Sequence, residues 1–481
     1  MIVSRREFVL ASAALAGWRF TDAPAPVPFG PVPSARQLAW HELEFYGFLH
    51  FTVNTFTNRE WGDGDESPAV FNPTDFDADQ IVEAAKNGGM KGLILTCKHH
   101  DGFCLWPSRF TDHSVRQSAW RAGRGDVVRE ISEACARAGV KFGMYLSPWD
   151  RNRADYGQPE YLTYYRNQLR ELLTEYGPVF EIFLDGANGG DGYYGGAYER
   201  REIDNRTYYD WPNTWQLVRE LQPDTVLFSD AGPDIRWVGN ENGIAGETCW
   251  ATQNSADFAP GRADAARLNR GDRPGTNWVP AECDVSIRPG WFYHKHEDDQ
   301  VKTSEQLVDL YYKSVGRGAS FLLNLPPDRR GRIHENDVAS LRGLKRYLDA
   351  TFGMDLAAKA RVSASNARSG FPAANIVDGK GETYWACDDG VKTPSVTLDF
   401  DRPTTFNVVR LREYLPLGQR IEAVAVDAWR SGRWSVFGTA TSIGSCRLIR
   451  GSRVETNRVR VRVVRGAVSP AISEITLFSE G

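Results

Sequence analysis

The stretch Pro178-Val-Phe-Glu-Ile-Phe-Leu-Asp185-Gly186 contains the unit from which the fold can be inferred. It is a short apolar run that ends in a carboxylate, and a helical pattern precedes it. The apolar positions of that pattern recur at helical spacing: Tyr161, Tyr164, Tyr165, Leu169, Leu172 and Leu173. A helix that leads into a buried strand is the repeating unit of proteins with parallel sheets.

This alternation of strands and helices runs from about residue 37 to residue 353. The expected strands are Phe45–Thr52, Lys91–Lys98, Lys141–Pro148, Val179–Gly186, Thr225–Gly232, Gly246–Thr252, Trp278–Ile287 and Ser320–Pro327. The expected helices are Ala78–Asn87, Asp126–Ala138, Pro159–Tyr176, Thr214–Gln222, Thr303–Val315 and a closing Glu335–Leu348. This pattern predicts an α/β fold, a (β/α)8-like (TIM-type) barrel rather than a doubly wound sheet. The sixth and seventh units are irregular, with a long Gly/Asp/Arg-rich loop at Gln253–Asn277.

The pattern changes after Gly353, where short β-rich runs replace the helical periodicity. These runs include Ser395–Phe400, Asn407–Leu411, Ile421–Trp429 and Arg458–Val464. Residues 355–481 are therefore predicted to form an all-β sandwich. The segment Asp355–Ala360 is expected to link it to the barrel domain, residues 37–353.

The N-terminus has the features of an export signal. Arg5 and Arg6 precede an apolar run from Phe8 to Trp18, which is too short to cross a bilayer as a helix. Residues 1–25 are therefore predicted to be a twin-arginine-type signal peptide, and the protein to be periplasmic or secreted. The alternative is a buried N-terminal helix.

Composition excludes several classes of partner and site. The net charge is −5 and no basic stripe is present, so nucleic acid is not an expected partner. The seven cysteines have scattered spacing and no CxxC pair, which argues against a disulfide framework and against a structural zinc site. The sequence specifies no oligomeric state.

Polar and aromatic residues stand where the predicted strands end, which is where active sites of such barrels lie. One such carboxylate would be an ordinary helix cap, but consecutive strands that end this way indicate a functional mouth. The residues concerned are His50, Glu60, Trp61, His99, His100, Tyr145, Asp185, Trp237, Glu241, Glu282 and Asp284.

The two adjacent histidines bear on whether this mouth binds a metal. Metal-dependent hydrolases on barrels usually place two ligands at i and i+2, whereas His99 and His100 are neighbours. Adjacent residues of a strand point to opposite faces, so both can reach one site only where the strand opens into its loop. We expect no metal and no cofactor, with a metal site as the minor alternative.

Carboxylates, histidines and tryptophans without a phosphate loop suit glycoside hydrolysis, which needs two carboxyl groups beside the scissile bond. Asp185 is the expected nucleophile, because the apolar strand fixes it and Gly186 leaves room for a sugar ring. Glu241, in the turn-rich loop Gly239–Gly243, is the candidate acid/base; the residues alone leave a plain surface glutamate as an equal alternative. Glu282 is the reserve acid/base.

Several stretches, in one order, resemble the α-L-fucosidases of glycoside hydrolase family 29. They are Phe45–Phe56, Glu60–Gly62, Thr96–Trp106, Tyr145–Asp150, Glu181–Asn188, Gly232–Gly243, Ser286–His294 and Phe321–Asp328. The resemblance covers about residues 37–350. It implies an irregular barrel that hydrolyses terminal α-L-fucose with retention and without a metal.

The resemblance also implies individual roles. Asp185 matches the nucleophile, and the residues matching those that hold the fucose hydroxyls or line the pocket are His50, Glu60, Trp61, His99, His100, Tyr145 and Trp237. The run Gly232–Glu241 is similar to the subfamily that prefers α-1,3/1,4-fucosyl branches, where this glutamate is the acid/base. One departure is the segment Gly189–Thr207, longer than usual after the nucleophile, which is expected to reshape the aglycone side.

The C-terminal part resembles a discoidin-like (F5/8 type C) domain, also used as a carbohydrate-binding module. The matching residues, such as Thr383-Tyr-Trp385 and Ile475–Phe478, are core positions and specify a fold rather than a ligand. The expected partner is a fucosylated oligosaccharide or glycoconjugate. The alternatives are a non-catalytic fucose-binding or glycan-binding protein, and a fucosidase of another linkage preference.

Overall fold

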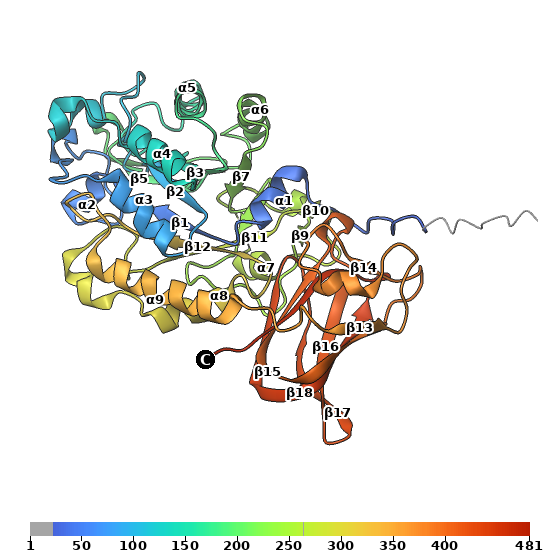
Figure 1. Ribbon diagram of the computed structural model, residues 1–481. Coiled ribbons are helices and arrows are strands. Elements are labelled where there is room, and N and C mark those ends of the chain that lie inside the picture. Colours follow the sequence, from blue (N-terminus) through green and yellow to red (C-terminus); the bar gives the residue numbers. More distant parts are fainter. Residues whose placement is uncertain (1–22, 263) are drawn as a thin grey trace, which may run out of the picture.

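The computed structural model describes residues 23–481 except residue 263, and its two domains are seen in Figure 1. Most of the predicted signal peptide, residues 1–22, lies outside the described residues, so the signal peptide stays a prediction. Residues 24–33 run as an extended segment into the first helix, α1 (Ala35–His41).

The first domain is a closed barrel of parallel strands in the order β1-β12-β11-β8-β7-β4-β3-β2. The barrel strands are β1 (Phe45–Leu49), β2 (Gly92–Lys98), β3 (Lys141–Leu146), β4 (Glu181–Phe183), β7 (Val226–Ser229), β8 (Ile235–Trp237), β11 (Ala281–Ser286) and β12 (Ser320–Asn324). Their residues are almost all buried, as expected for a sheet covered on both faces. The predicted (β/α)8-like barrel is confirmed.

Helices pack around this barrel and present one apolar face to it. They are α2 (Val53–Thr57), α3 (Ala78–Asn87), α4 (Val127–Ala138), α5 (Glu160–Glu175), α6 (Trp211–Leu221), α7 (Ala265–Arg270), α8 (Ser304–Lys313) and α9 (Glu335–Phe352). Asp77 and Asp126 accept hydrogen bonds from the first-turn backbones of α3 and α4, which fixes where these helices begin. The start of α6 was predicted at Thr214; the helix begins at Trp211, because Pro212 suits a first turn.

The sixth strand was predicted wrongly. The barrel strand is β8, Ile235–Trp237, and it follows β7 after a short turn with no helix between them. Ile235 is fully buried inside the barrel, where it contributes to the same core as Phe228. Of the predicted strand Gly246–Thr252, only the last residue lies in a strand, β9 (Thr252–Gln253). β9 pairs with β10 (Asn277–Trp278) outside the barrel.

Side chains fill the barrel in layers. Alternate residues of a strand point inward, so Glu181, Phe183 and Asp185 rise from the lower interior to the mouth along β4 and its end. Phe183 stacks on Phe228 with ring centroids 3.7 Å apart and packs beside Phe48, which closes the floor beneath the mouth.

The C-terminal domain is an antiparallel sheet structure, as predicted. Its strands follow the order β14-β19-β15-β18-β16-β17, with β13 paired to β15. They are β13 (Arg361–Ala364), β14 (Trp385–Ala386), β15 (Ser395–Glu413), β16 (Ile421–Arg430), β17 (Arg433–Ala440), β18 (Arg447–Gly466) and β19 (Ala471–Phe478). β15 and β18 bend at register shifts and enclose an apolar core of their own.

In the barrel domain, β5 (Gly189–Gly192) and β6 (Glu199–Glu202) form a separate hairpin.

The two domains are joined by polar contacts as well as by the linker. Arg412 of β15 pairs with Glu44, just before β1. The backbone N–H of Ala251 donates to Gln419 (2.7 Å), and Arg273 donates to the Gln419 carbonyl (3.0 Å). The extended N-terminal segment adds a further link, because the Phe29 N–H donates to the Leu417 carbonyl (3.0 Å).

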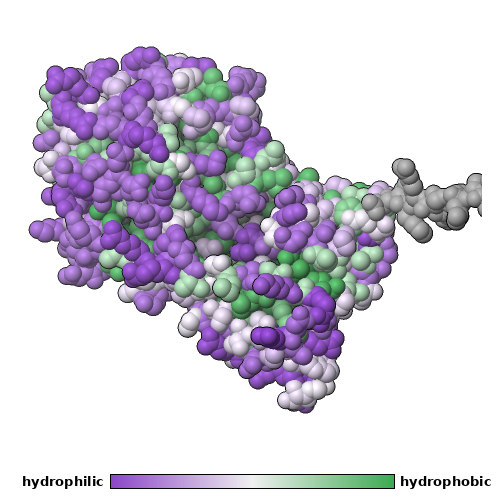
Figure 2. All heavy atoms as spheres, in the orientation of Figure 1, coloured by the Kyte–Doolittle hydropathy of each residue, from purple (hydrophilic) through white to green (hydrophobic). Residues whose placement is uncertain are grey.

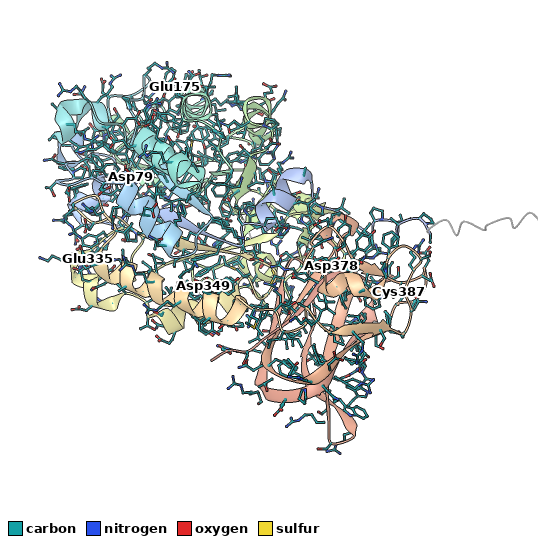
Figure 3. The ribbon with its side chains drawn as sticks, viewed as in Figure 1. Asp79, Glu175, Glu335, Asp349, Asp378 and Cys387 are labelled. Carbon is teal, nitrogen blue, oxygen red and sulfur yellow. The ribbon has the colours of Figure 1, made fainter. Side chains whose placement is uncertain are left out.

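The outer surface of the barrel helices is hydrophilic in the view of Figure 2. The carboxylates labelled on these helices in Figure 3 are paired with bases, for example Asp79 with Arg137 (2.6 Å) and Glu335 with Arg330 (3.0 Å). Within the described residues, none of the helices is both long and apolar enough to cross a membrane. All seven cysteines, including Cys387 labelled in Figure 3, are buried and free.

Candidate active site

A cavity of about 440 Å³ opens at the carboxyl ends of the barrel strands. Its lining includes every predicted site residue except the reserve Glu282: His50, Glu60, Trp61, His99, His100, Tyr145, Asp185, Trp237 and Glu241. The strand ends meet at this edge, so residues far apart in the sequence converge there.

Asp185 lies at the base of this cavity, two residues beyond the end of β4. Its side chain is 46% exposed, and that exposure is to the cavity. The Tyr145 hydroxyl donates to Asp185 Oδ2 (3.3 Å), and His100 Nε2 lies 3.9 Å from the same oxygen. Burial in the site and the neighbouring carboxyls of Asp230 and Glu241 raise the pKa of Asp185 to about 7.

His50 and His100 are neutral hydrogen-bonding groups, because burial lowers the pKa of each to about 3. Ser147 Oγ donates its proton to the Trp149 carbonyl (2.6 Å), so it accepts a hydrogen bond from His100 Nδ1 (2.7 Å). In the same way, His50 Nδ1 donates to the Asn324 amide oxygen (2.9 Å). Each ring therefore presents Nε2 as an acceptor for a substrate hydroxyl.

His99 reaches the same cavity as His100 although the two are adjacent. The register between β2 and β3 shifts between Thr96 and Lys98, which changes the phase of the side chains at the strand end. The two rings lie 4.1 Å apart between centroids, just past the end of β2. Burial also lowers the pKa of His99 well below its usual value.

Glu241 lies in the exposed loop Gly239–Gly243 at the rim of the cavity. Its Oε2 accepts a hydrogen bond from the Trp291 indole N–H (3.1 Å). Asn240 organises the loop by accepting from the Asn242 N–H (3.1 Å). Gly239 has φ of +87°, and a Cβ there would lie 2.2 Å from the Ala265 carbonyl oxygen, so only glycine lets the loop rest against α7.

The reserve candidate Glu282 is not placed for acid/base chemistry. It points into the barrel like Asp284 on the same strand, but two residues lower, where its side chain is fully buried. There it accepts from the Tyr46 hydroxyl and lies beside Glu181, and burial and this second carboxyl raise its pKa well above the usual value. Asp284, one layer higher, lines the cavity and accepts from the Trp237 indole N–H (2.9 Å).

Comparisons with known proteins decide the family. A family model described as Alpha-L-fucosidase matches residues 34–351, and one described as F5/8 type C domain matches residues 360–475.

The chain belongs to the α-L-fucosidases of glycoside hydrolase family 29.

Several relatives match it over nearly the whole length. Alpha-L-fucosidase 1 of Arabidopsis thaliana is 43% identical over 95% of this chain and 89% of its own. The crystal structure of a putative alpha-L-fucosidase from Bacteroides thetaiotaomicron is 38% identical, with a TM-score of 0.87, and covers 95% of this chain and 99% of its own. A Ruminococcus gnavus family 29 fucosidase solved in complex with fucose is 32% identical, with a TM-score of 0.85, over 96% of this chain and 97% of its own. The resemblance seen in the sequence is thus confirmed for the family and for the C-terminal domain.

Two residues that line the cavity of this fucosidase, Asp230 and Trp291, are absent from the predicted site. Asp230 directly follows β7, and burial raises its pKa; its Oδ2 accepts from the Gly261 N–H (2.8 Å). Its position was detectable, because it ends a strand just as Asp185 does. Trp291 gave no comparable signal, since it lies in a loop several residues beyond β11.

The segment predicted to be unusually long after Asp185 is the β5–β6 hairpin. Gly189, Gly190 and Asp191 of β5 and Arg200 of β6 line the cavity. The hairpin rests on Trp149, whose ring would lie 2.9 Å from a Cβ on Gly190. It therefore forms one wall of the entrance, beside the exposed Trp61.

The described residues contain one group of at least three potential metal ligands close enough to share an ion: Asp63, Asp65 and Glu66. None of the cavity histidines belongs to it. Asp63 pairs with Arg59, and the Asp63 N–H donates to Glu66 (2.7 Å), so this group is part of the structure of its loop.

Proposed function

We propose that the protein is a retaining exo-α-L-fucosidase in which Asp185 is the nucleophile and Glu241 the acid/base. The observation that carries this proposal is that both carboxyl groups line one cavity, whose lining also includes neutral histidines and aromatic rings. Retaining glycosidases need two such groups, one to attack the anomeric carbon and one to protonate the leaving oxygen.

The proposed reaction has two steps. Glu241 protonates the leaving oxygen while Asp185 attacks the anomeric carbon, which gives a covalent fucosyl-enzyme. Glu241 then takes a proton from water, and that water releases fucose with its configuration retained. The acceptor nitrogens of His50 and His100 suit the hydroxyls of a sugar held over Asp185.

The first step requires an ionised Asp185 beside a protonated acid/base. Burial and the like charges of Asp230 and Glu241 raise the pKa of Asp185 to about 7, so Asp185 is mainly ionised only above about that pH.

Replacing Asp185 with alanine tests the nucleophile. We expect turnover of an aryl fucoside to fall on the order of a thousand-fold or more, because no covalent intermediate can form. The thermal midpoint should be unchanged or higher, since the substitution removes a carboxyl from a cluster of carboxyls. Turnover at the rate of the unmodified protein would reject the assignment. Lack of fucose release by the unmodified protein would instead favour a non-catalytic fucose-binding protein.

For the linkage, we propose a preference for α-1,3/1,4-fucosyl branches. The similarity of the run Gly232–Glu241, which ends at the proposed acid/base, to the subfamily with this preference supports the proposal. The β5–β6 hairpin is the feature most able to change the linkage preference, because it lies at the cavity entrance, where the aglycone must leave. Fucose release should be faster from a branched α-1,3/1,4-fucosylated oligosaccharide than from an α-1,2-linked one, and the reverse order would assign another linkage.

We also propose that residues 1–25 direct export by the twin-arginine route and that the C-terminal domain binds glycans. The pair Arg5-Arg6 before a short apolar run supports export. Changing both arginines to lysine should retain the protein in the cytoplasm.

Glycan-array binding by the full chain with a blocked active site would detect a glycan site on the C-terminal domain. Absence of binding would indicate that this domain only braces the barrel.

A further inference from the structure

The loop after β11 is fixed by one carboxylate from the loop after β1. Glu60 Oε2 accepts from the Trp291 N–H (2.7 Å), and Glu60 Oε1 accepts from the Phe292 N–H (3.2 Å). His294 Nε2 lies 2.6 Å from Glu60 Oε1, and its Nδ1 contacts Asn58 (2.9 Å). Both oxygens of Glu60 are thus engaged by the loop that carries Trp291.

The other side of Trp291 is held from the barrel. The Asn324 side-chain amide donates to the Trp291 carbonyl (2.8 Å) and to Ser286 Oγ (2.9 Å), at the end of β11. The Trp291 ring lies against His50, with centroids 5.0 Å apart. The backbone and the ring of Trp291 are therefore both fixed before any ligand enters.

This fixed indole meets an otherwise exposed glutamate. Trp291 Nε1 donates to Glu241 Oε2 at 3.1 Å. An indole N–H can only donate, so this contact takes up one oxygen of Glu241 and leaves the other free to exchange a proton in the cavity. A glutamate in an exposed loop would otherwise lose the freedom of several rotatable bonds each time it acts.

We propose that Trp291 is the positioning residue of the acid/base Glu241, and that Glu60 and His294 act through it. The inference rests on the proposed function, and it gives Glu60 a structural task distinct from contact with a sugar. It links three loops: Glu60 after β1, Trp291 after β11 and Glu241 after β8. A defect in Trp291 should impair proton transfer by Glu241 and leave attack by Asp185 intact.

The test compares two substrates with different needs for an acid. A 2,4-dinitrophenyl fucoside has a leaving group that departs without protonation, whereas a fucosylated oligosaccharide needs Glu241 to protonate its leaving oxygen. For Trp291→Phe, which keeps a ring but removes the N–H, we expect kcat/KM to fall about tenfold or more on the oligosaccharide and less than about threefold on the aryl fucoside. Azide, which replaces the activated water, should raise kcat of the variant on the aryl fucoside.

The ratio of the two kcat/KM values does not depend on how much of the variant folds, because the active enzyme concentration cancels. Trp291→Met, which also has no N–H or O–H to donate, is the second variant if the phenylalanine variant does not accumulate. Trp434→Phe, the same change on the C-terminal domain, is the control and should leave the ratio unchanged. Equal losses on both substrates, or no loss on the oligosaccharide, would overturn the role of Trp291. Failure of the unmodified enzyme on both substrates would instead reject the proposed function.

Discussion

Glu282 and Asp284 have the same orientation on β11 but different surroundings, and the difference decides what each can do. Glu282 lies in the lower interior against Glu181, while Asp284 reaches the cavity. A sequence lists both as carboxylates near a strand end, and it does not say in which layer the mouth begins. Burial alone separates them, which is why Glu282 could not be excluded as an acid/base from the sequence.

The buried pair Glu181 and Glu282 should make stability depend on pH. Burial raises the pKa of Glu181 to about 8 and that of Glu282 well above its usual value. In the unfolded chain both titrate near 4.3, so the folded state holds protons that the unfolded state releases. The contribution of this pair to the stability of the protein should therefore fall as the pH rises from about 4 to about 8.

Glu282→Gln removes one of these carboxyls and keeps an acceptor for Tyr46. We expect the variant to have a higher thermal midpoint than the unmodified protein at pH 8, and the difference between the two midpoints to be smaller at pH 5. Differential scanning calorimetry of both proteins at both pH values measures this difference. Because Glu282 does not line the cavity, fucoside turnover should persist. Midpoints with the same pH dependence in both proteins would show that the pair is not protonated in the folded state.

At the scale of elements, the prediction of the eight barrel strands fails only at β8. β1 to β4, β7, β11 and β12 carry apolar runs with a predicted helix before or after them, and their expected ranges overlap the observed ones. β8 is three residues long and follows β7 directly, so no helical pattern separates the two strands in the sequence. The run before Thr252 fits the expected strand pattern better than β8 does, although it packs outside the barrel. The convergence of Asp185 and the three histidines was predictable, because each ends a strand.

The loop that carries Glu241 should be sensitive at Gly239. Alanine there would place its Cβ 2.2 Å from the Ala265 carbonyl oxygen, and φ is +87°. We expect Gly239→Ala to push the loop off α7, to lower kcat/KM on an oligosaccharide by about tenfold or more, and to lower the thermal midpoint.

Gly139→Ala is the matched control, because Gly139 also has a positive φ, +70°, but open space around its Cβ position. It should cost about 1–2 kcal/mol of stability from backbone strain and leave kcat/KM unchanged. Equal kinetic effects of the two substitutions would contradict the role given to the contact with α7.

At the scale of the whole molecule, the barrel and the C-terminal domain are expected to unfold together. The Arg412–Glu44 pair lies at their junction, with both side chains largely buried. Burial disfavours ionised Glu44, but the charge and hydrogen bond of Arg412, together with the charges of Lys91 and Arg410, outweigh burial and lower the pKa of Glu44. Arg412→Leu would leave this carboxylate buried without its partner, which costs about 3–5 kcal/mol.

Calorimetry should accordingly show a lower midpoint for Arg412→Leu and a separation of the two domain transitions. Arg361→Leu breaks an exposed pair with Asp401 inside the C-terminal domain and should change stability by less than about 1 kcal/mol. A single unshifted transition for Arg412→Leu would show that the linker and the apolar contacts suffice to couple the domains.

The central claim is that Asp185 forms a covalent bond to fucose during turnover. The most direct measurement is to trap that species with 2-deoxy-2-fluoro-α-L-fucosyl fluoride and to locate the label by peptide mass spectrometry. The predicted result is one labelled peptide with the sugar on Asp185, and no label in Asp185→Ala. A label on another carboxylate, such as Asp230, or turnover without any trapped species and with inverted fucose as the first product, would contradict it.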